Sequence, residues 1–157
     1  MKLYHGTNAQ FETIALSKSK DKRDFGKGFY TTTIFEQAEK WAKNQFIRYG
    51  GEGSFVKEYD FLENTNLRIK FFPEMNEEWL EFVKKCRTED GTPHDYDIIK
   101  GPVANDNTMR TIALYISGIY STEQAIDRLK FFKVNNQISF HTEKALNCLT
   151  WNLDREV

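Results

Sequence analysis

Residues 24–33 read "DFGKGFYTTT" and combine two closely spaced glycines with an aromatic, β-branched run. Such residues favour strands, so residues 26–32 predict a short strand with glycine at its entrance. The pair Gly26 and Gly28 is a weak signal for nucleotide binding, because neither a Walker sequence nor a third glycine completes a phosphate-binding pattern. A turn or bulge explains these glycines most simply, although exposed backbone N–H groups beside Lys27 would also suit a phosphate.

The sequence on either side of this strand predicts a strand before it and a helix after it. The run "KLYHGT" at residues 2–7 has strand composition, and the polar, basic residues 15–24 predict a surface loop. After residue 32, Thr33 and Glu36 fit a capping box, and apolar residues then recur at helical spacing until Gly50. The apolar positions of this predicted helix are Phe35, Ala38, Trp41, Ala42 and Phe46.

The rest of the chain mixes strands and helices without the regular alternation of a doubly wound parallel sheet. Further strands are predicted at residues 54–61, 65–72, 95–103 and 136–142. Further helices are predicted at residues 73–87 with Pro73 in the first turn, 106–120 with a break at Gly118, 122–132 after a Ser121–Gln124 capping box, and 143–151 after a Thr142 cap. Strands that cluster early and return late predict an α+β fold with a largely antiparallel sheet, in one domain spanning residues 1–157.

Composition excludes several classes of protein. Hydrophobic residues make up 39% and aromatic residues 15% of the 157 positions, which is typical of a folded chain rather than a disordered one. The formal net charge of −1 creates no global field for nucleic acid or anionic membranes. The start of the chain lacks the pattern of a signal peptide, and the most apolar window, residues 111–120, is about half as long as a membrane span. Cys86 and Cys148 have no metal-binding or redox spacing, so a reduced, cytoplasmic protein is expected.

Several residues could carry chemistry, although each of them alone is more often structural. His5 precedes Gly6 and Thr7, which would let a ligand approach the backbone and would supply a hydroxyl. Tyr30 and Trp41 are ordinary core residues or aromatic walls for a flat cationic ring. The side chains of Gln137, Ser139 and His141 share one strand face, which would usually point to solvent. The histidines and cysteines have no recognised zinc spacing, so no metal site is predicted.

In combination, these segments resemble a domain-of-unknown-function family placed among the ADP-ribosyltransferases. The resemblance spans residues 3–150 and rests on the order of its motifs rather than on any one of them. The motifs are "YHGT" at residues 4–7, "DFGKGFYTTT" at 24–33, "EQAEKWA" at 36–42, "DYDIIKGPVAND" at 95–106 and "NQISFHTEKAL" at 136–146. The resemblance implies a split antiparallel β-sheet core with flanking helices and a site for NAD+.

The resemblance also implies roles for individual residues. In the diphtheria-toxin and poly-ADP-ribose-polymerase type, a His–Tyr–Glu arrangement on three strands binds NAD+. Carried over, His5 bonds the adenosine-side ribose, the Gly6 backbone bonds the nicotinamide amide, and Tyr30 stacks on the nicotinamide ring. Trp41 falls at the second aromatic position. The hydroxyl of Thr7 and the loop residues Lys27 and Gly28 complete the expected cofactor contacts.

The third catalytic position falls on Gln137, where the pattern more often has glutamate. A glutamine keeps a hydrogen bond to the ribose hydroxyl but supplies neither a full negative charge nor a base. A transferase with this residue therefore needs a good nucleophile as acceptor, or help from another carboxylate. Asp97 and Asp106 are the candidates for that help.

Three functions follow as hypotheses. The first is an ADP-ribosyltransferase-like enzyme that passes ADP-ribose to a protein or nucleic acid. By analogy with small bacterial domains of this kind, it would act as a toxin or conflict-system effector with a cognate antitoxin. The second is a non-catalytic module that keeps the fold and NAD+ binding. It is suggested by Gln137, which replaces the glutamate expected in an active enzyme. The third is nucleic-acid binding through a basic stretch with nearby aromatic residues. This stretch contains Lys18, Lys20, Lys22, Arg23 and Lys27.

Overall fold

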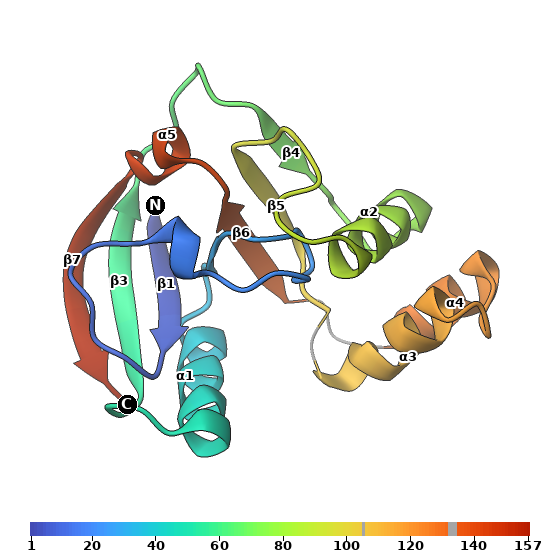
Figure 1. Ribbon diagram of the computed structural model, residues 1–157, viewed down its shortest axis with the longest axis horizontal. Coiled ribbons are helices and arrows are strands. Elements are labelled where there is room, and N and C mark those ends of the chain that lie inside the picture. Colours follow the sequence, from blue (N-terminus) through green and yellow to red (C-terminus); the bar gives the residue numbers. More distant parts are fainter. Residues whose placement is uncertain (105, 132–134) are drawn as a thin grey trace.

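The computed structural model describes residues 1–104, 106–131 and 135–157, with only the backbone described at 106 and 107. These residues form two β-sheets, five α-helices and one short 3-10 helix, in a mixed α and β architecture (Figure 1). Within the described part of the chain, no helix is long and apolar enough to cross a membrane.

The first sheet has three antiparallel strands in the order β1–β3–β7. They are β1 (Lys2–Thr7), β3 (Phe55–Phe61) and β7 (Leu149–Glu156). The register places His5 of β1 opposite Lys57 of β3. β1 thus lies at the edge of this sheet that faces the second sheet, and it carries His5 and Gly6 to the junction between them.

The second sheet has four strands in the order β2–β6–β5–β4. They are β2 (Phe29–Thr31), β6 (Asn136–Phe140), β5 (Ile98–Pro102) and β4 (Ile69–Phe71). All pairs are antiparallel except β4 with β5. The two sheets meet where Tyr4 and Thr32 exchange backbone hydrogen bonds of 2.8 and 2.9 Å.

The helices cover the sheets on separate sides. α1 (Phe35–Tyr49) packs against β1, whereas α2 (Glu77–Thr88), α3 (Asp106–Ile116) and α4 (Thr122–Leu129) gather beside the second sheet (Figure 1). The 3-10 helix η1 (Leu16–Lys18) lies in the long segment from β1 to β2. α5 (Glu143–Leu146) connects β6 to β7.

Two apolar clusters form the core. One lies between the second sheet and the helices α2, α3 and α4, and centres on Trp79, Phe72 and Phe25. The other lies between the two sheets and includes Leu3 and Phe140, both fully buried. Burial of these large side chains is the main favourable term for the fold.

Many sequence predictions of elements are confirmed. Strands occur where residues 2–7 and 54–61 predicted them, and the first helix ends at Gly50. The Ser121–Gln124 capping box is present, and the Thr142 hydroxyl accepts a hydrogen bond from the Ala145 N–H at 3.1 Å. The predicted helix over 122–132 ends at residue 129, and its last position lies outside the described residues.

Two predictions of helix starts are wrong. α1 begins after Ile34 without a side-chain cap, because Thr33 is bound by Asn136 instead. The Asn136 Nδ2 donates to the Thr33 hydroxyl at 2.6 Å, and the Thr33 N–H donates to Asn136 Oδ1 at 3.0 Å. α2 begins at Glu77 rather than at Pro73, because the Asn76 side chain accepts from the Trp79 N–H at 3.0 Å and caps the helix there.

The predicted helix over residues 143–151 is also wrong beyond its first turn. α5 ends at Leu146, and the chain enters β7 at Leu149. β7 pairs with β3 along its whole length, with a shift in register at Glu58 and Tyr59. These ladder hydrogen bonds with β3 outweigh the local helical pattern.

Candidate functional site

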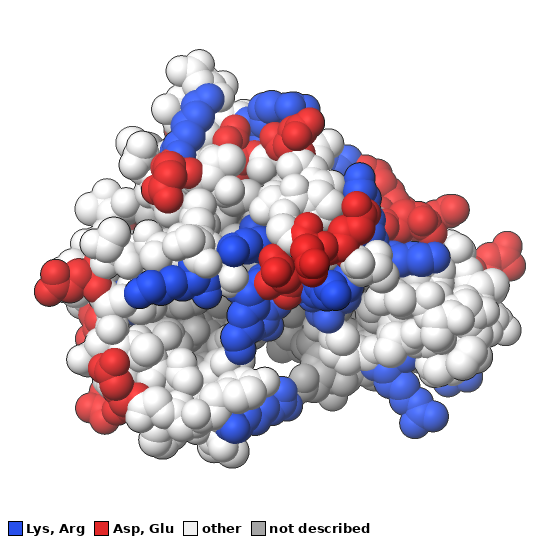
Figure 2. Space-filling view, in the orientation of Figure 1, with Lys and Arg blue, Asp and Glu red and all other residues white. Residues whose placement is uncertain are grey.

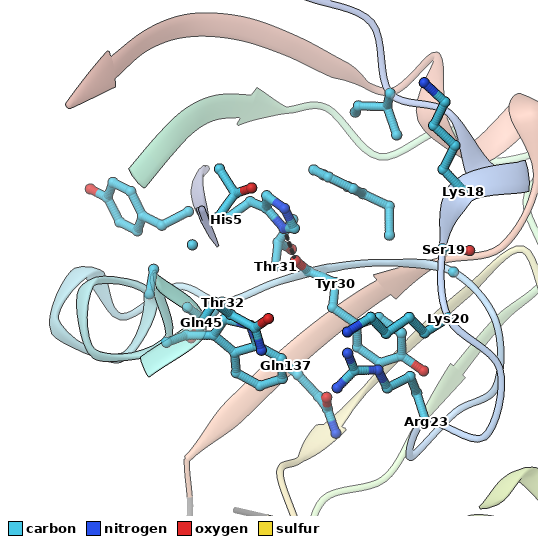
Figure 3. A pocket seen from close by; sticks show the side chains of 18 of the residues that line it. His5, Lys18, Ser19, Lys20, Arg23, Tyr30, Thr31, Thr32, Gln45 and Gln137 are labelled. Atoms are coloured by element: carbon cyan, nitrogen blue, oxygen red, sulfur yellow. Dashed lines mark hydrogen bonds between the residues drawn. The ribbon is translucent and has the colours of Figure 1, made fainter. Parts of the chain in front are cut away.

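A cavity of about 470 Å³ opens at the junction of the two sheets. Its walls are β1, β2, the inner side of α1 and the segment between β1 and β2 (Figure 3). This volume lies within the range that small-molecule ligands and cofactors occupy. The cavity is therefore large enough to hold a small-molecule ligand or cofactor.

Most of the predicted site residues lie together at this cavity. They are His5, Gly6, Thr7, Gly28, Tyr30, Trp41 and Gln137. Lys27 is not among the lining residues: its C=O accepts from the Thr92 hydroxyl at 3.0 Å and its N–H donates to the Gly91 C=O at 2.8 Å. The structure thus brings together seven of the eight predicted residues and leaves Lys27 beside the loop that precedes β5.

His5 joins the two sheets and presents a neutral ring to the cavity. Its Nδ1 lies 2.7 Å from the Tyr30 C=O. Burial lowers the pKa of His5 to about 4, an effect opposed by that hydrogen bond and reinforced by the charge of Lys57. A carbonyl only accepts, so the neutral ring carries its proton on Nδ1 and keeps Nε2 as an acceptor.

Two of the predicted glycines are required by close packing. A Cβ on Gly6 would lie 2.1 Å from the Ala38 C=O oxygen of α1, and a Cβ on Gly28 would lie 2.6 Å from the His141 ring. Glycine at these positions therefore has a structural reason that is independent of any ligand. The same close approach of β1 to α1 shapes the wall of the cavity.

Tyr30 uses its hydroxyl to hold the loop in front of β2. The hydroxyl donates to the Gly26 C=O at 2.6 Å and accepts from the Phe25 N–H at 2.9 Å. Burial is the largest cause that raises the pKa of Tyr30 far above its usual range, so the phenol stays protonated. The ring of Tyr30, rather than its hydroxyl, is the part that remains for a ligand.

Basic and aromatic side chains share one end of the cavity. Lys18, Lys20, Arg23 and Arg87 line it, and the Arg23 guanidinium lies 5.7 Å from the ring centre of Trp41. Lys and Arg side chains gather around the hollow in the middle of this face (Figure 2). This end of the cavity therefore suits an anionic group, although the whole chain carries a net charge of only −1.

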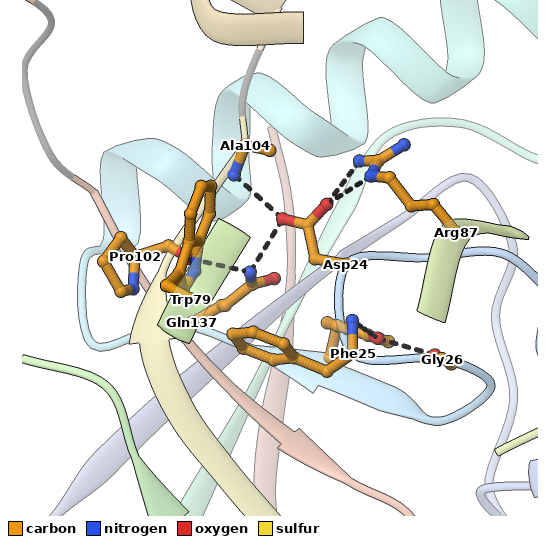
Figure 4. A network of polar contacts seen from close by, with 9 residues as sticks. Asp24, Phe25, Gly26, Trp79, Arg87, Pro102, Ala104 and Gln137 are labelled. Atoms are coloured by element: carbon orange, nitrogen blue, oxygen red, sulfur yellow. Dashed lines mark hydrogen bonds and ion pairs between the residues drawn. The ribbon is translucent and has the colours of Figure 1, made fainter. Parts of the chain in front are cut away.

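Gln137 is buried and belongs to a polar network at the same end of the cavity. Its Nε2 donates to Asp24 Oδ2 at 2.9 Å and to the Pro102 C=O at 3.0 Å (Figure 4). Asp24 also accepts from the Ala104 N–H at 2.8 Å and forms an ion pair with Arg87. Among the described lining residues, Asp24 is the only acidic one.

Of the two carboxylates suggested by the sequence, Asp97 does not lie at the cavity. Asp97 accepts from the Arg68 N–H and the Thr142 hydroxyl, at 2.8 and 2.7 Å, and does not line the cavity. Burial would raise the pKa of Asp97, but these hydrogen bonds outweigh it and the pKa is lowered. The side chain of Asp106 lies outside the part of the chain that the structure describes.

The polar face of β6 points inward rather than to solvent. Gln137, Ser139 and His141 are all buried. The His141 Nδ1 lies 2.8 Å from the Lys27 C=O, which can only accept, so the proton of the neutral ring is on Nδ1. Nε2 then accepts a hydrogen bond from the Ser139 hydroxyl, 2.7 Å away. This serine and histidine pair is enclosed in the core and does not line the cavity, so its role is to hold the loop that contains Gly28.

No cluster of three or more histidine, cysteine, aspartate or glutamate side chains suited to a metal ion occurs within the described ranges. The cavity is lined by neutral hydrogen-bonding groups, aromatic faces, basic side chains and the carboxylate of Asp24. Such a site can bind and orient a ligand that combines anionic groups, hydroxyls and a flat ring.

Comparison with known proteins places the chain in a family. A sequence model described as "Protein of unknown function (DUF3990)" matches residues 1–151. The chain belongs to this family. No curated protein and no solved structure matches it. The match covers nearly the whole chain, and the description of the family states no activity.

Sequence reasoning missed Asp24 and Arg87. Asp24 stands directly before the "FGKGF" run, where it reads as a loop residue, and Arg87 reads as a charge near the end of a helix. They lie 63 positions apart, and Asp24 lies 113 positions from Gln137. The one signal in the sequence was that Asp24 directly precedes an aromatic residue, Phe25, which is fully buried in the structure.

Proposed function

We propose that the chain is an NAD+-dependent enzyme with an ADP-ribosyltransferase-like fold. It transfers the ADP-ribosyl group of NAD+ to a macromolecular acceptor, a protein or a nucleic acid, and releases nicotinamide. The observation that supports this most is that His5, Tyr30 and Gln137, from three strands in two sheets, line one cavity. This is the combination that the resemblance implies for a dinucleotide site.

The cavity offers complementary groups for the diphosphate, the nicotinamide ring and a ribose of NAD+. The basic end, with Lys20 and Arg23, suits the diphosphate. The rings of Tyr30 and Trp41 suit the cationic nicotinamide ring. The free Nε2 of His5 accepts a hydrogen bond from a ribose hydroxyl.

The proposed reaction is a substitution at the ribose carbon that carries nicotinamide. That carbon–nitrogen bond breaks, its electron pair leaves with nicotinamide, and the ribose gains positive charge as in glycoside hydrolysis. The acceptor atom then bonds to the same carbon and releases its proton to solvent. The Oε1 of Gln137 accepts a hydrogen bond from the neighbouring ribose hydroxyl and so orients the sugar.

The acceptor has to be a good nucleophile already. Asp24, the acidic residue among the described cavity walls, is committed to Arg87, Ala104 and Gln137 through its hydrogen bonds. A group that accepts several donors is a poor general base. We therefore expect transfer to an amine, thiolate or other reactive group rather than to an alcohol that needs activation.

The glutamine at position 137 also supports a second function, NAD+ binding without cleavage. An uncharged Gln137 stabilises a cationic ribose less than a carboxylate would. The chain would then bind NAD+ without cleaving it and act as a sensing or interaction module. The two functions differ in nicotinamide release and agree in NAD+ binding.

The test is to mix labelled NAD+ with the protein and cell lysate, and to follow free nicotinamide and label in protein and nucleic-acid fractions. The informative pair of variants is Trp41→Ala and Phe46→Ala on α1. The exposed fractions of these two side chains are 36% and 41%, but only Trp41 lines the cavity. We expect W41A to weaken NAD+ binding at least about tenfold, as loss of a stacking ring does, and F46A to leave it unchanged.

Each result decides between the hypotheses. Nicotinamide release together with labelled macromolecule supports the transferase, and the labelled fraction gives the acceptor class. Binding without release supports the non-catalytic module. Absence of binding at millimolar NAD+, or equal effects of W41A and F46A, contradicts both.

A transferase that modifies macromolecules of its own cell would act as a toxin and need a cognate antitoxin. This extension rests on analogy between small domains of this kind. Expression of the wild type and of W41A in the same host tests it. Growth arrest by the wild type alone supports it, and equal growth of both strains contradicts it.

A further inference from the structure

Asp24 is a buried carboxylate whose four hydrogen bonds come from three separate parts of the fold. Its exposed fraction is 5%. Oδ1 accepts from Arg87 of α2, through Nε at 2.8 Å and through a terminal guanidinium nitrogen. Oδ2 accepts from the Ala104 N–H at 2.8 Å and from Gln137 Nε2 at 2.9 Å (Figure 4). Buried charges persist when they are paired in this way.

These contacts determine which way the amide of Gln137 points. Both groups at its Nε2, Asp24 Oδ2 and the Pro102 C=O, can only accept hydrogen bonds. If the amide were turned over, Oε1 would face two acceptors and lose both bonds. The oxygen is therefore directed away from Asp24 and Pro102 (Figure 4). Among the described residues, the hydrogen bonds of the Gln137 side chain are those of its Nε2.

We propose that Asp24 is a positioning residue that holds the Gln137 amide with its oxygen toward the cavity, so that the site offers an oriented, uncharged acceptor to a donor group of the ligand. The orientation itself follows from the contacts on either side of the amide. Its consequence for NAD+ turnover rests on the proposed function.

The same network disfavours a glutamate at position 137. A carboxylate there would lie about 3 Å from the Asp24 carboxylate and from the Pro102 C=O, as the present contacts of Gln137 show. Two carboxylates so close do not both ionise, so the pair keeps a proton and one apparent pKa rises strongly. In this position glutamine supplies two hydrogen-bond donors at every pH, whereas a glutamate would supply one donor and only below its pKa.

The charged and titratable groups around this pair come from several elements. Asp24 faces it from the loop before β2, and Arg87 of α2 partly compensates the charge of Asp24. Arg23 and Tyr30 line the same cavity, and Cys86 of α2 lies close enough to Asp24 to interact electrostatically. Among these groups only Asp24 contacts Gln137 directly, so the effect of a new carboxyl depends on Asp24 first.

The experiment is a carboxyl titration of Gln137→Glu by NMR with 13C-labelled glutamate, in which the variant shows one signal more than the wild type. We expect this signal to titrate at least about two pH units above an ordinary glutamate. The matched control is Gln45→Glu, which places a carboxyl on the same cavity from α1, away from Asp24. If the glutamates introduced in Q137E and Q45E have the same apparent pKa, the proposal is overturned.

Two further variants separate positioning from a purely structural role. In Q137E combined with Asp24→Asn the neighbouring negative charge is absent, so we expect the apparent pKa of the new glutamate to fall toward that of the control variant. In Q137E combined with Arg87→Gln the compensating cation is absent, so we expect the apparent pKa of the new glutamate to rise further. The second combination keeps the test decisive if the first does not fold, and movement in the opposite direction overturns the proposal.

NAD+ turnover gives a separate readout. Below its apparent pKa the protonated carboxyl of Q137E donates its one proton to Asp24 and turns its other oxygen to the cavity, while the Pro102 C=O loses the donor that the amide gives it. We expect turnover of Q137E to fall as pH rises through that value, while the wild type shows no such step. If the wild type does not cleave NAD+, the proposed function fails, and the NMR titration still decides the role of Asp24.

Discussion

Gly6 is the residue at which the packing of β1 against α1 leaves no room for a side chain. A methyl group there would lie 2.1 Å from the Ala38 C=O oxygen and 2.9 Å from the Ala42 nitrogen, both in the helix backbone. Backbone atoms of a packed helix do not move aside as a flexible side chain does. We expect Gly6→Ala to lower the free energy of unfolding by about 3 kcal/mol, measured by urea denaturation.

The control for this prediction is Gly118→Ala, after the end of α3. Gly118 has a φ of 85° and open space where its Cβ would lie, so the substitution costs backbone strain alone, roughly 1 kcal/mol. If both variants lose the same stability, the close approach of β1 to α1 is not what requires glycine at position 6.

The sequence predicted individual site residues where a local pattern singled them out. His5 with Gly6 and Tyr30 in an aromatic strand were found in this way, and all line the cavity. Lys27 was chosen because it stands between two glycines, but the loop turns its backbone toward Gly91 and Thr92. Asp24 was not predictable, because its partners are distant in sequence and only the folded chain brings them together.

At the scale of elements, the last strand holds one partner of an ion pair with a buried lysine, which the sequence does not reveal. Lys57 of β3 has an exposed fraction of 1%, and its Nζ lies 2.8 and 2.9 Å from the two carboxylate oxygens of Asp154 in β7. The same Nζ donates to the Phe11 C=O at 2.8 Å, in the segment that lines the cavity. The pair therefore connects β7, β3 and the cavity wall.

Removal of the charge of Asp154 should test this connection. Asp154→Asn leaves the Lys57 ammonium buried without a counter-charge, and we expect a loss of about 2 kcal/mol in the free energy of unfolding, since Asp154 itself is partly exposed. The matched control is Asp127→Asn, which breaks an exposed pair with Lys130 and should cost less than about 0.5 kcal/mol. Equal losses in urea denaturation would show that Lys57 does not need Asp154.

Two of the helix caps were predictable, and the last strand was not. Ser121 and Thr142 cap their helices because the cap is a contact within three residues, which a sequence displays directly. β7 was missed because the Thr142 cap favoured a longer helix over the alternation of Leu149, Trp151 and Leu153. Its stability comes from pairing with β3, almost a hundred positions earlier, and such pairing overrides local preference.

At the scale of the whole molecule, buried neutral histidines hold the walls of the cavity together. His5 connects β1 to the Tyr30 C=O of β2, and His141 connects the end of β6 to the Lys27 C=O. Burial lowers the pKa of both to about 4, and it also lowers the pKa of His94. These are the three histidines of the chain, so none of them is expected to carry charge at neutral pH.

This arrangement predicts that the fold weakens in mild acid. In the unfolded chain a histidine binds a proton below about pH 6.5, whereas His5 and His141 stay neutral in the folded protein until about pH 4. The unfolded state therefore binds more protons in this interval, and the free energy of unfolding falls as pH falls, by about 1 kcal/mol per pH unit for each histidine. Urea denaturation at pH 7.5, 6.5, 5.5 and 5.0 measures it, above the range where most carboxylates titrate.

The variant His141→Gln assigns the effect to one of these groups. Its amide can donate to the Lys27 C=O and accept from the Ser139 hydroxyl, but it does not titrate. We expect the slope of stability against pH between 5.0 and 6.5 to decrease by about 1 kcal/mol per pH unit, with no change of slope above pH 7. An unchanged slope below pH 6.5 would mean that His141 is charged in the folded protein, and that the contact between β6 and the loop of Lys27 has a different hydrogen-bonding pattern from the one described.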